Sequence, residues 1–320
     1  MSSTSSSSDS SYNIHRLTAD NLDALQYIYK DAFGKEISLS ELHKKQDTSA
    51  FGPSFVGYIA YSEENEPAAF YGVFPCLLSY NGKQYLGAQS GDTMTHSNHR
   101  GKGLFTLLAK KTYELCRELG VDLVFGFPNE NSYPGFVRKL DWEHVNDMVP
   151  YIIRVRTLSY ARIKQIIGLS AVSHLKWCDF VLNQCKPGKA FDSSVLESNK
   201  GGILRNQDFF AYKTYENNRI IEVSGIQVWV KTNHDFLIIG DIEKCSDKKF
   251  LEVIKRLKRM AFIMGLHHLR FQCTSGAFHE KHFASISKKL DVKYPVGGVN
   301  FTNRFPLSHL HFTTSDNDGF

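Results

Sequence analysis

The strongest constraint on the fold is an internal repeat of the order strand, helix, glycine and strand. Phe105 and Gly120 of the first copy correspond to Phe250 and Gly265 of the second, at a constant separation of 145 residues. In each copy an apolar helical period ends at the glycine and is followed by a short apolar run typical of a buried strand. Because 320 residues exceed the usual size of one domain, the repeat predicts two lobes of related α/β structure.

Composition indicates a folded protein, and its net charge fits a small ligand better than a polyanion such as nucleic acid. Hydrophobic residues make up 42% and charged residues 22%, which is too apolar for intrinsic disorder. The formal net charge is only +5, far from the dense basic face of a protein that binds a duplex. We therefore expect no nucleic-acid partner, whereas a small anionic ligand fits this charge.

The sequence indicates neither disulfides nor a metal site. Its six cysteines form no Cys-x-x-Cys pair and lie in apolar patterns, so we expect reduced, packed thiols. His279 and His282 can share one helix face, but no further ligand lies at metal-binding spacing, so we expect a solvated pair and no metal.

The chain carries no sign of export or of a membrane span. No apolar run reaches the roughly 18 residues that a bilayer requires. Residues 1–11 are rich in Ser and lack both a basic region and an apolar core. We expect a disordered tail, no membrane partner and a cytoplasmic location.

Periodicity and turn signals predict alternating helices and strands before residue 150 and again after residue 200. The expected helices cover 22–33, 39–46 and 104–119, and the expected strands cover 14–17, 55–61, 68–80, 84–95 and 121–127. Residues 151–185 are expected to be mainly helical. Strands at 220–223, 227–231, 236–240 and 266–273, with a helix at 250–264, are expected in the second lobe.

A glycine turn, His99-Arg-Gly-Lys-Gly103, lies between a predicted strand and a predicted helix. Gly101 and Gly103 permit positive φ and close approach of the backbone to a ligand. Unpaired N–H groups at the start of the helix attract an anion, and Arg100 and Lys102 add positive charge. The pattern predicts a diphosphate site. The second copy is four residues shorter at this point and has no glycine, so we expect the site only once.

Two nucleotide-binding motifs are absent from the chain. No GxxxxGK followed by Ser or Thr is present, and no GxGxxG follows a first strand. This argues against nucleotide hydrolysis and against a Rossmann unit.

The segment Thr95-His-Ser-Asn-His-Arg-Gly-Lys-Gly-Leu104 resembles motif A of the GCN5-related N-acetyltransferases, or GNATs. With the order of elements, the resemblance covers roughly residues 12 to 150. It implies an α/β (α+β) fold: a GNAT-like mixed, mostly antiparallel sheet flanked by helices, duplicated as two lobes. It also implies acetyl-CoA as co-substrate, without a metal. The residues expected to bind acetyl-CoA are Met94, Thr95, His99, Arg100, Gly101, Lys102, Gly103, Leu104 and Asn131.

Five regions are expected on this basis. They are a disordered Ser-rich tail at 1–11, a GNAT acetyl-CoA-binding catalytic domain at 12–150, a helical connector at 151–200, a degenerate GNAT-like second lobe at 201–312 and a tail at 313–320.

The segment from Asn129 to Trp142 is similar to the end of a GNAT domain, where a tyrosine is thought to protonate the departing CoA thiolate. Val137 occupies that position here. Tyr133, four residues earlier, is the nearest substitute, with packing as its alternative role. For Asn131, turn formation is the alternative to cofactor binding.

Transfer to an amine also needs a group that takes up a proton. Glu130 is the candidate, and Asp92 and His96 remain open beside it. Each also has a structural alternative: Glu130 in solvent, Asp92 in a turn and His96 in packing.

The expected function is acetyl-CoA-dependent N-acetyl transfer, by direct attack, to a primary amine of a small molecule or protein. We favour a small-molecule acceptor. One alternative is a catalytically inactive acyl-CoA-binding regulatory protein, which Val137 favours. A less favoured alternative is a Fem-type aminoacyl transferase, which the tandem arrangement resembles although no long coiled-coil arm is present.

Overall fold

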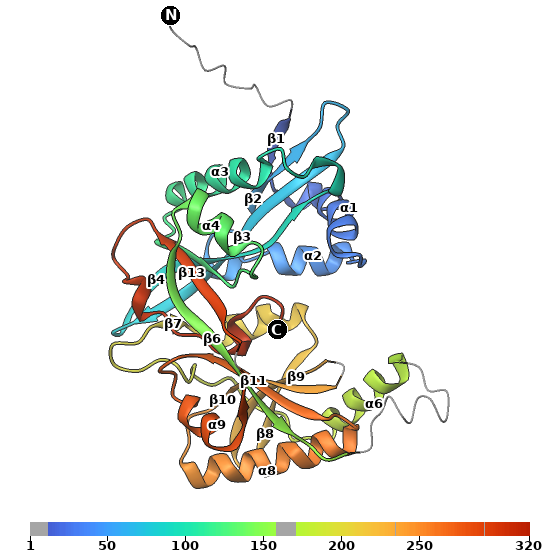
Figure 1. Cartoon of the computed structure of the whole chain (residues 1–320), viewed down its shortest axis with the longest axis vertical. Coiled ribbons are helices and arrows are strands. Elements are labelled where there is room, and N and C mark those ends of the chain that lie inside the picture. Colours follow the sequence, from blue (N-terminus) through green and yellow to red (C-terminus); the bar gives the residue numbers. More distant parts are fainter. Residues whose placement is uncertain (1–11, 158–170, 234, 291) are drawn as a thin grey trace, which may run out of the picture. The chain divides into compact units, whose positions relative to one another are not determined.

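The computed structural model describes residues 12–157, 171–233, 235–290 and 292–320 (Figure 1). The expected Ser-rich tail and part of the expected connector therefore lie outside the described residues. The chain divides into two compact units. Unit 1 comprises Met1–Phe74 and Ser90–Gly120, and unit 2 comprises Pro75–Gln89 and Val121–Phe320.

Unit 1 contains the first strands and the helices that cover them. Two long strands, β3 and β4, begin or end in unit 1 and continue into unit 2. Its elements are β1 (Asn13–Arg16), α1 (Leu22–Phe33), α2 (Leu39–Gln46), β2 (Val56–Tyr61), β3 (Pro67–Tyr80), β4 (Lys83–Thr95) and α3 (Leu104–Glu118).

Neighbouring residues of β3 show how the helices of unit 1 are distributed, because successive side chains of a strand point to opposite faces. Phe70 belongs to a buried cluster with Leu25 of α1 and Leu42 of α2. The hydroxyl of Tyr71 lies 2.9 Å from that of Tyr113 in α3. Helices α1 and α2 therefore cover one face of the sheet, and α3 covers the other.

Unit 2 is built on a sheet in the order β5-β13-β6-β11-β10-β9-β8. Its elements are β5 (Leu123–Gly126), α4 (Tyr133–Leu140), β6 (Glu143–Arg154), α6 (Ala171–Asn183), β7 (Gly202–Ile203), α7 (Gln207–Tyr212), β8 (Asn218–Val223), β9 (Ile226–Asn233), β10 (Phe236–Ile242), α8 (Asp247–Met264), β11 (His268–Thr274), α9 (Glu280–Ile286), β12 (Lys288–Lys289) and β13 (Tyr294–Asn300).

The sheet pairings confirm the expected mixed, mostly antiparallel fold. Strands β10 and β11 are parallel, and α8 connects them. The pairs β1–β2, β2–β3, β6–β11, β5–β13, β6–β13, β8–β9 and β9–β10 are antiparallel. The predicted order of strand, helix, glycine and strand is present in the second copy, where α8 ends at Gly265 with φ +72°. In the first copy Gly120 follows α3 with φ +76°.

The expected boundary at residue 150 falls inside a strand. Strand β6 extends to Arg154, and its residues Met148–Arg154 pair with β11. Strand β13 also lies between β5 and β6 and pairs with both. Hydrogen bonds across these ladders join β5 and β6 to the later strands, so they belong to unit 2. The start of the expected helical connector is therefore strand, whereas α6 lies within the range expected to be helical.

The segment 313–320, expected as a tail, is packed in unit 2. The Thr313 amide donates to Asp316 at 2.7 Å, and Phe320 is buried. Arg205, with no exposed side-chain surface, bridges the buried carboxylates of Asp241 and Asp316. Three buried charges and their hydrogen bonds hold this segment in place.

The expectation of a solvated His279 and His282 was wrong, because both side chains are buried. His279 Nε2 lies 2.8 Å from the carbonyl oxygen of Ile242, and His282 Nε2 lies 2.9 Å from a carboxylate oxygen of Asp247. Burial lowers the pKa of His279 to about 4. His282 thus connects α9 to the start of α8, and His279 connects it to the end of β10.

Other structural expectations concern thiols, metals and membranes. All six cysteines are free, and four of them are buried. Within the described ranges, no group of three His, Cys, Asp or Glu side chains is placed to hold a metal ion. Among those same ranges, no helix has both the length and the apolar character needed to cross a membrane.

Candidate functional site

The glycine turn, residues 99–103, connects the end of β4 to the start of α3 in unit 1. Gly101 and Gly103 have φ of +77° and +79°, and no atom lies within 4 Å of the position that a Cβ would take at either residue. Gly103 stands at the N-cap without a capping side chain. The start of α3 therefore has no side-chain cap in front of its N–H groups, as an anion-binding helix end requires.

The charge around the turn is positive. Arg100 and Lys102 are exposed, and the first turn of α3 has no acidic residue. The Arg100 Nε–H donates to the carbonyl oxygen of Thr95 at 3.3 Å, which holds the guanidinium beside the turn. This set of donors fits a diphosphate.

The corresponding helix start in unit 2 is closed. The Ser246 hydroxyl caps α8 by accepting the Lys249 amide, and Asp247 puts a carboxylate in the first turn. A capped, acidic helix start repels an anion. This contrast supports the expectation that the anion site occurs once.

An acidic residue of α1 fixes the start of the turn. Asp31 accepts hydrogen bonds from the Ser97 amide at 2.6 Å and from the Ser97 hydroxyl at 2.8 Å. These two bonds lower the pKa of the Asp31 carboxyl. The sequence analysis missed this residue, because a separation of 66 positions gives no local signal.

Tyr12 lies against the same turn. Its hydroxyl is 2.8 Å from His99 Nδ1, and the Lys102 ammonium lies 5.7 Å from the centre of its ring. Burial, followed by the charges of Lys102 and His96, lowers the pKa of His99. His99 is therefore neutral at pH 7 and becomes charged only below its ordinary range.

Three expected cofactor-binding residues are differently placed. The side chains of Met94 and Leu104 are each 2% exposed and pack in the core, so only their backbone groups can face a ligand. The Thr95 carbonyl accepts the Arg100 bond, and its side chain is half-buried.

The alternative bases Asp92 and His96 also lie in unit 1. Lys45 Nζ lies 2.8 Å from a carboxylate oxygen of Asp92, and both side chains are about nine-tenths buried. Asp92 has φ +50°, in the left-handed region that a non-glycine residue seldom adopts. His96 stacks on Tyr27 with ring centres 5.3 Å apart. Both candidates are thus engaged with neighbouring side chains.

The remaining candidates lie in unit 2, between β5 and α4. Asn129 Oδ1 accepts the amides of Asn131 and Ser132 at 3.0 and 2.9 Å, which makes Asn129 the turn-forming residue. Asn131 and Glu130 are exposed. The structure therefore assigns the turn to Asn129 and leaves the side chains of Glu130 and Asn131 in solvent.

Tyr133 is the first residue of α4, which accommodates Pro134 in its first turn. Because Tyr133 and Val137 are four residues apart in one helix, they share a face. Burial, followed by the charge of Asp147, raises the pKa of Tyr133, so its phenol stays protonated at neutral pH. Val137 is 39% exposed and has no proton to give.

One family model matches the N-terminal part of the chain. Residues 13–145 match the family model described as "Acetyltransferase (GNAT) domain". A search of curated protein sequences returned no match.

Solved structures share the fold at low sequence identity. A GCN5-related N-acetyltransferase from Kribbella flavida is 13% identical, with a TM-score of 0.57 over 91% of this chain and 72% of that one. A putative acetyltransferase from Pyrococcus horikoshii is 13% identical, with a TM-score of 0.53 over 96% of each chain. The N-myristoyltransferase of Saccharomyces cerevisiae, solved with myristoyl-CoA, is 10% identical, with a TM-score of 0.58 over 97% of this chain and 91% of that one.

Proposed function

We propose that the chain is an N-acetyltransferase that moves an acetyl group from acetyl-CoA to a primary amine, because residues 13–145 match the family model of a GNAT acetyltransferase domain. The domain itself supports acyl transfer in general. The acetyl donor, the amine acceptor and the roles of individual residues are the proposal.

The glycine turn is the observation that carries this function. Its two positive-φ glycines leave open space before α3, and Arg100 and Lys102 flank the uncapped helix start. The diphosphate of acetyl-CoA is a double anion that matches these donors. His99 and the backbone of Met94, Thr95 and Leu104 complete the proposed binding set in unit 1. Asn131 is proposed as a cofactor contact on the family resemblance alone.

The reaction is a direct displacement. The lone pair of a neutral amine attacks the thioester carbonyl carbon, a C–N bond forms and the C–S bond breaks. The amine loses one proton, and the CoA thiolate gains one. The chain has to align the two reactants and move those protons, and alignment contributes much of the rate.

We assign the proton donor to Tyr133 and the proton acceptor to Glu130. The raised pKa of Tyr133 keeps its phenol protonated, so the hydroxyl has a proton to donate. Glu130 is exposed and can pass a proton to water. A small-molecule amine is the favoured acceptor, with an amino sugar, an amino acid and a polyamine as the classes to test.

The test is thiol release measured with DTNB from acetyl-CoA across a panel of amino sugars, amino acids, polyamines and amine-bearing peptides. We expect one class to accelerate thiol release, with mass spectrometry showing one acetyl group on the acceptor. Arg100→Ala combined with Lys102→Ala should raise the KM for acetyl-CoA. Thiol release that is independent of every acceptor would contradict N-acetyl transfer.

A second function is favoured by one observation, the valine at position 137. If the chain binds acyl-CoA for regulation only, calorimetry will show CoA binding while no amine releases thiol. This outcome would retain the glycine turn as a binding site and reject the catalytic roles of Tyr133 and Glu130.

A further inference from the structure

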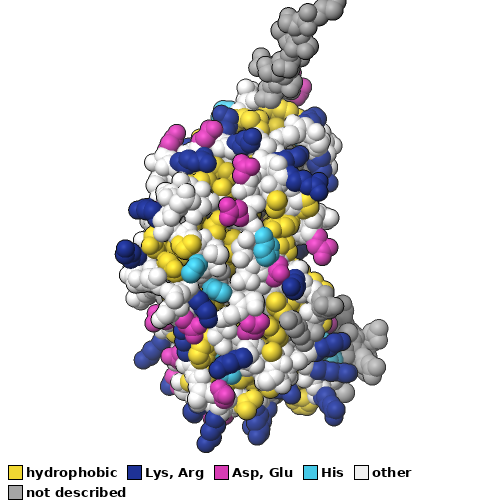
Figure 2. Space-filling view, turned by 60° about the vertical axis from the view of Figure 1, so that its left-hand side comes forward, with side chains coloured by type: hydrophobic (Ala, Val, Ile, Leu, Met, Phe, Trp, Pro, Cys, Tyr) yellow, Lys and Arg dark blue, Asp and Glu magenta, His cyan; other side chains and the backbone are white. Residues whose placement is uncertain are grey.

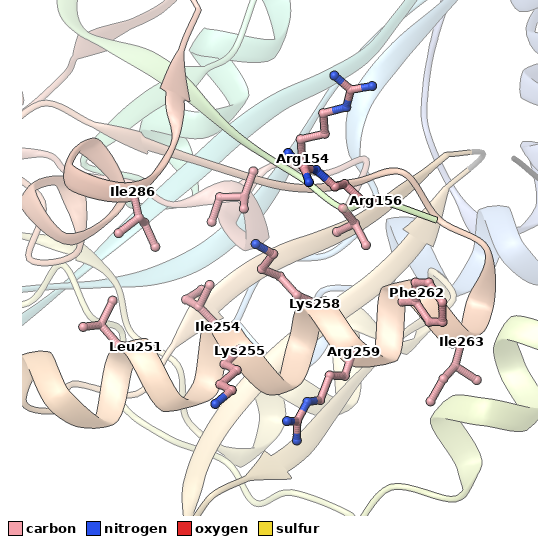
Figure 3. A pocket seen from close by; sticks show the side chains of 12 residues that line it. Arg154, Arg156, Leu251, Ile254, Lys255, Lys258, Arg259, Phe262, Ile263 and Ile286 are labelled. Carbon is pink, nitrogen blue, oxygen red and sulfur yellow. The ribbon is translucent and has the colours of Figure 1, made fainter. Parts of the chain in front are cut away.

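Positive charge alone does not single out an anion site in this chain. Figure 2 shows Lys and Arg side chains spread over the face that it presents. A pocket of unit 2 between α8 and the end of β6 is lined by five cations, Arg154, Arg156, Lys255, Lys258 and Arg259. These cations do not converge, because Lys258 points from α8 toward the strand whereas Lys255 and Arg259 point away from it (Figure 3). An anion site needs donors whose directions are fixed, and the glycine turn of unit 1 has such donors.

The two histidines beside the glycine turn differ in what their ring nitrogens contact. His96 uses both nitrogens within unit 1, because Nδ1 accepts the Asn98 amide at 3.4 Å and Nε2 lies 3.6 Å from a carboxylate oxygen of Asp31. His99 Nδ1 lies 2.8 Å from the Tyr12 hydroxyl, and Nε2 has no partner in the described part of the chain. His99 is therefore the histidine with a ring nitrogen left for a ligand.

The contact with Tyr12 decides which nitrogen of His99 carries the proton. At neutral pH the imidazole is uncharged, because burial lowers its pKa, and it then has one N–H and one bare nitrogen. A bare imidazole nitrogen is a better acceptor than a phenol oxygen, whose lone pair is shared with the ring. The Lys102 ammonium, 5.7 Å from the centre of the Tyr12 ring, draws electron density from that ring and strengthens its hydroxyl as a donor. The Tyr12 hydroxyl thus donates to Nδ1, and the proton of His99 lies on Nε2.

This tautomer suits a phosphate. An Nε2–H group is a donor, and phosphate oxygens are acceptors, whereas the other tautomer would turn a lone pair toward an anion. The rings of Tyr12 and His99 are nearly perpendicular, at 81°, so the hydroxyl also fixes the direction of the imidazole. Tyr12 precedes the segment 13–145 that matches the family model. The family match therefore does not account for this contact.

We propose that Tyr12 is a positioning residue that holds His99 in the Nε2–H tautomer, so that the imidazole donates a hydrogen bond to the diphosphate of CoA. The proposal rests on the proposed acetyl-CoA site at the glycine turn. Tyr12 acts through His99 and has no contact with the reacting atoms. The site then combines a directed neutral donor with the charges of Arg100 and Lys102.

The first test determines the tautomer by NMR, without CoA. In a chain labelled with ¹⁵N-histidine, the ring nitrogen that carries the proton resonates upfield of the bare nitrogen, and His99→Gln identifies the signals of His99. We expect the proton on Nε2 in the unchanged chain and a mixture of tautomers in Tyr12→Phe. Tyr27→Phe is the matched control, because it removes a hydroxyl from a ring that stacks on His96, and it should leave the His99 signals unchanged. A proton on Nδ1 in the unchanged chain would overturn the proposal.

The second test measures the affinity for CoA by calorimetry at pH 8. Tyr12→Phe should raise the Kd at least about fivefold, because the imidazole loses its fixed direction and in part its N–H toward the diphosphate. Tyr27→Phe should leave the Kd unchanged. Dephospho-CoA keeps the diphosphate and lacks the 3′-phosphate, so Tyr12→Phe should weaken its binding by the same factor. An effect that is lost with dephospho-CoA would place the contact at the 3′-phosphate and overturn the proposal.

The pH dependence separates a choice of tautomer from a loosened loop. When His99 becomes charged, both ring nitrogens carry protons and no choice of tautomer remains. The ratio of the two Kd values, Tyr12→Phe over the unchanged chain, should therefore decrease from pH 8 to pH 6. The other charged groups that act on His99 are present in both proteins and are Lys102, His96, Glu64 and Glu66. The same ratio at both pH values would show a loosened loop and reject the role of the tautomer.

A failure of the proposed function gives a different result from a failure of this inference. If the unchanged chain does not bind CoA, the acetyl-CoA site and the role of Tyr12 are both rejected. If the unchanged chain and Tyr12→Phe bind CoA equally, the site is retained and the role of Tyr12 alone is rejected.

Discussion

Gly103 holds a conformation that a β-branched residue adopts only with strain, at the point where α3 begins. We predict that Gly103→Val raises the Kd for CoA at least tenfold, about 1.4 kcal/mol, measured by calorimetry. Gly120→Val is the control, because Gly120 has a similar φ, equally open surroundings and a position at the other end of α3. Equal affinities for the two variants would show that strain alone, and not position, determines binding.

His99 makes the proposed binding site sensitive to pH. Its pKa in the folded chain is lowered below 6.5, mainly by burial. Protonation thus costs the free protein stability as the pH falls through that range. A bound phosphate would favour the protonated imidazole, so CoA affinity should increase between pH 8 and pH 6.

Calorimetry at both pH values checks this prediction, with His99→Gln as the comparison. The phosphates of CoA titrate in the same way with both proteins. The difference between the two proteins in their change of CoA affinity with pH therefore reports on residue 99 alone. The same pH dependence in both proteins would exclude His99 as the source.

Replacement of Tyr133 distinguishes a role as proton donor in the transition state from a role in packing. If its phenol protonates the thiolate, Tyr133→Phe should lower kcat on the order of 10²-fold with little change in the KM for acetyl-CoA. A role in packing alone predicts activity within about threefold, because phenylalanine preserves the ring. Steady-state kinetics with the acceptor found in the thiol-release screen distinguishes the two roles.

At the scale of elements, a buried hydroxyl network fastens α3 to the sheet. The Tyr71 hydroxyl lies 2.8 Å from Ser90 Oγ in β4 and 2.9 Å from the Tyr113 hydroxyl. We predict that Tyr71→Phe lowers the free energy of unfolding by about 1–3 kcal/mol, because two buried hydroxyls lose a partner. Urea unfolding measures the change, and Tyr58→Phe on β2, at a half-buried position, should change it by less.

The helices and strands of unit 1 could be predicted from local signals. The sequence analysis placed a helix at 39–46, and α2 has these bounds; in the structure Ser38 and Glu41 form a capping box at its start. Strand β13 and the pairing of Lys45 with Asp92 could not be predicted. Their partners lie far along the chain, and a sequence period describes only one element at a time.

The candidate site divides in the same way. The glycine turn could be predicted because its two glycines, its two cations and the start of a helix lie within a few consecutive residues. Asp31 and Tyr12 were not visible, because each reaches the turn from a different element.

At the scale of the whole molecule, each copy of the repeat buries an aspartate that is paired with a cation, at corresponding positions of the two copies. Gly91-Asp92 of β4 corresponds to Gly240-Asp241 of β10 at a separation of 149, because the second copy is four residues shorter before its helix. Each aspartate is paired with a cation that precedes its run of three strands. These cations are Lys45 and Arg205. The parallel supports the prediction that the second copy derives from a GNAT lobe.

The contribution of the buried charges around Arg205 to the stability of the protein can be measured. Arg205→Met would leave Asp241 and Asp316 buried without their cation, so we predict a loss of about 3–5 kcal/mol in the free energy of unfolding. The matched change Lys186→Met removes an exposed partner of Glu222 and should cost less than about 1 kcal/mol. Similar urea midpoints for the two variants would contradict a structural role for the cluster.

The insertion of β13 between β5 and β6 constrains the order in which the protein can be made and folded. Gly297 pairs with Gly126 across 171 positions of sequence. A nascent chain that has reached residue 154 therefore has β5 and β6 but lacks the strand that lies between them. Strand pairs so far apart in the sequence form slowly, because the entropy of closing a long loop is lost before the contacts of the ladder can offset it. The segment that matches the family model thus completes its sheet only after Tyr294–Asn300 has left the ribosome.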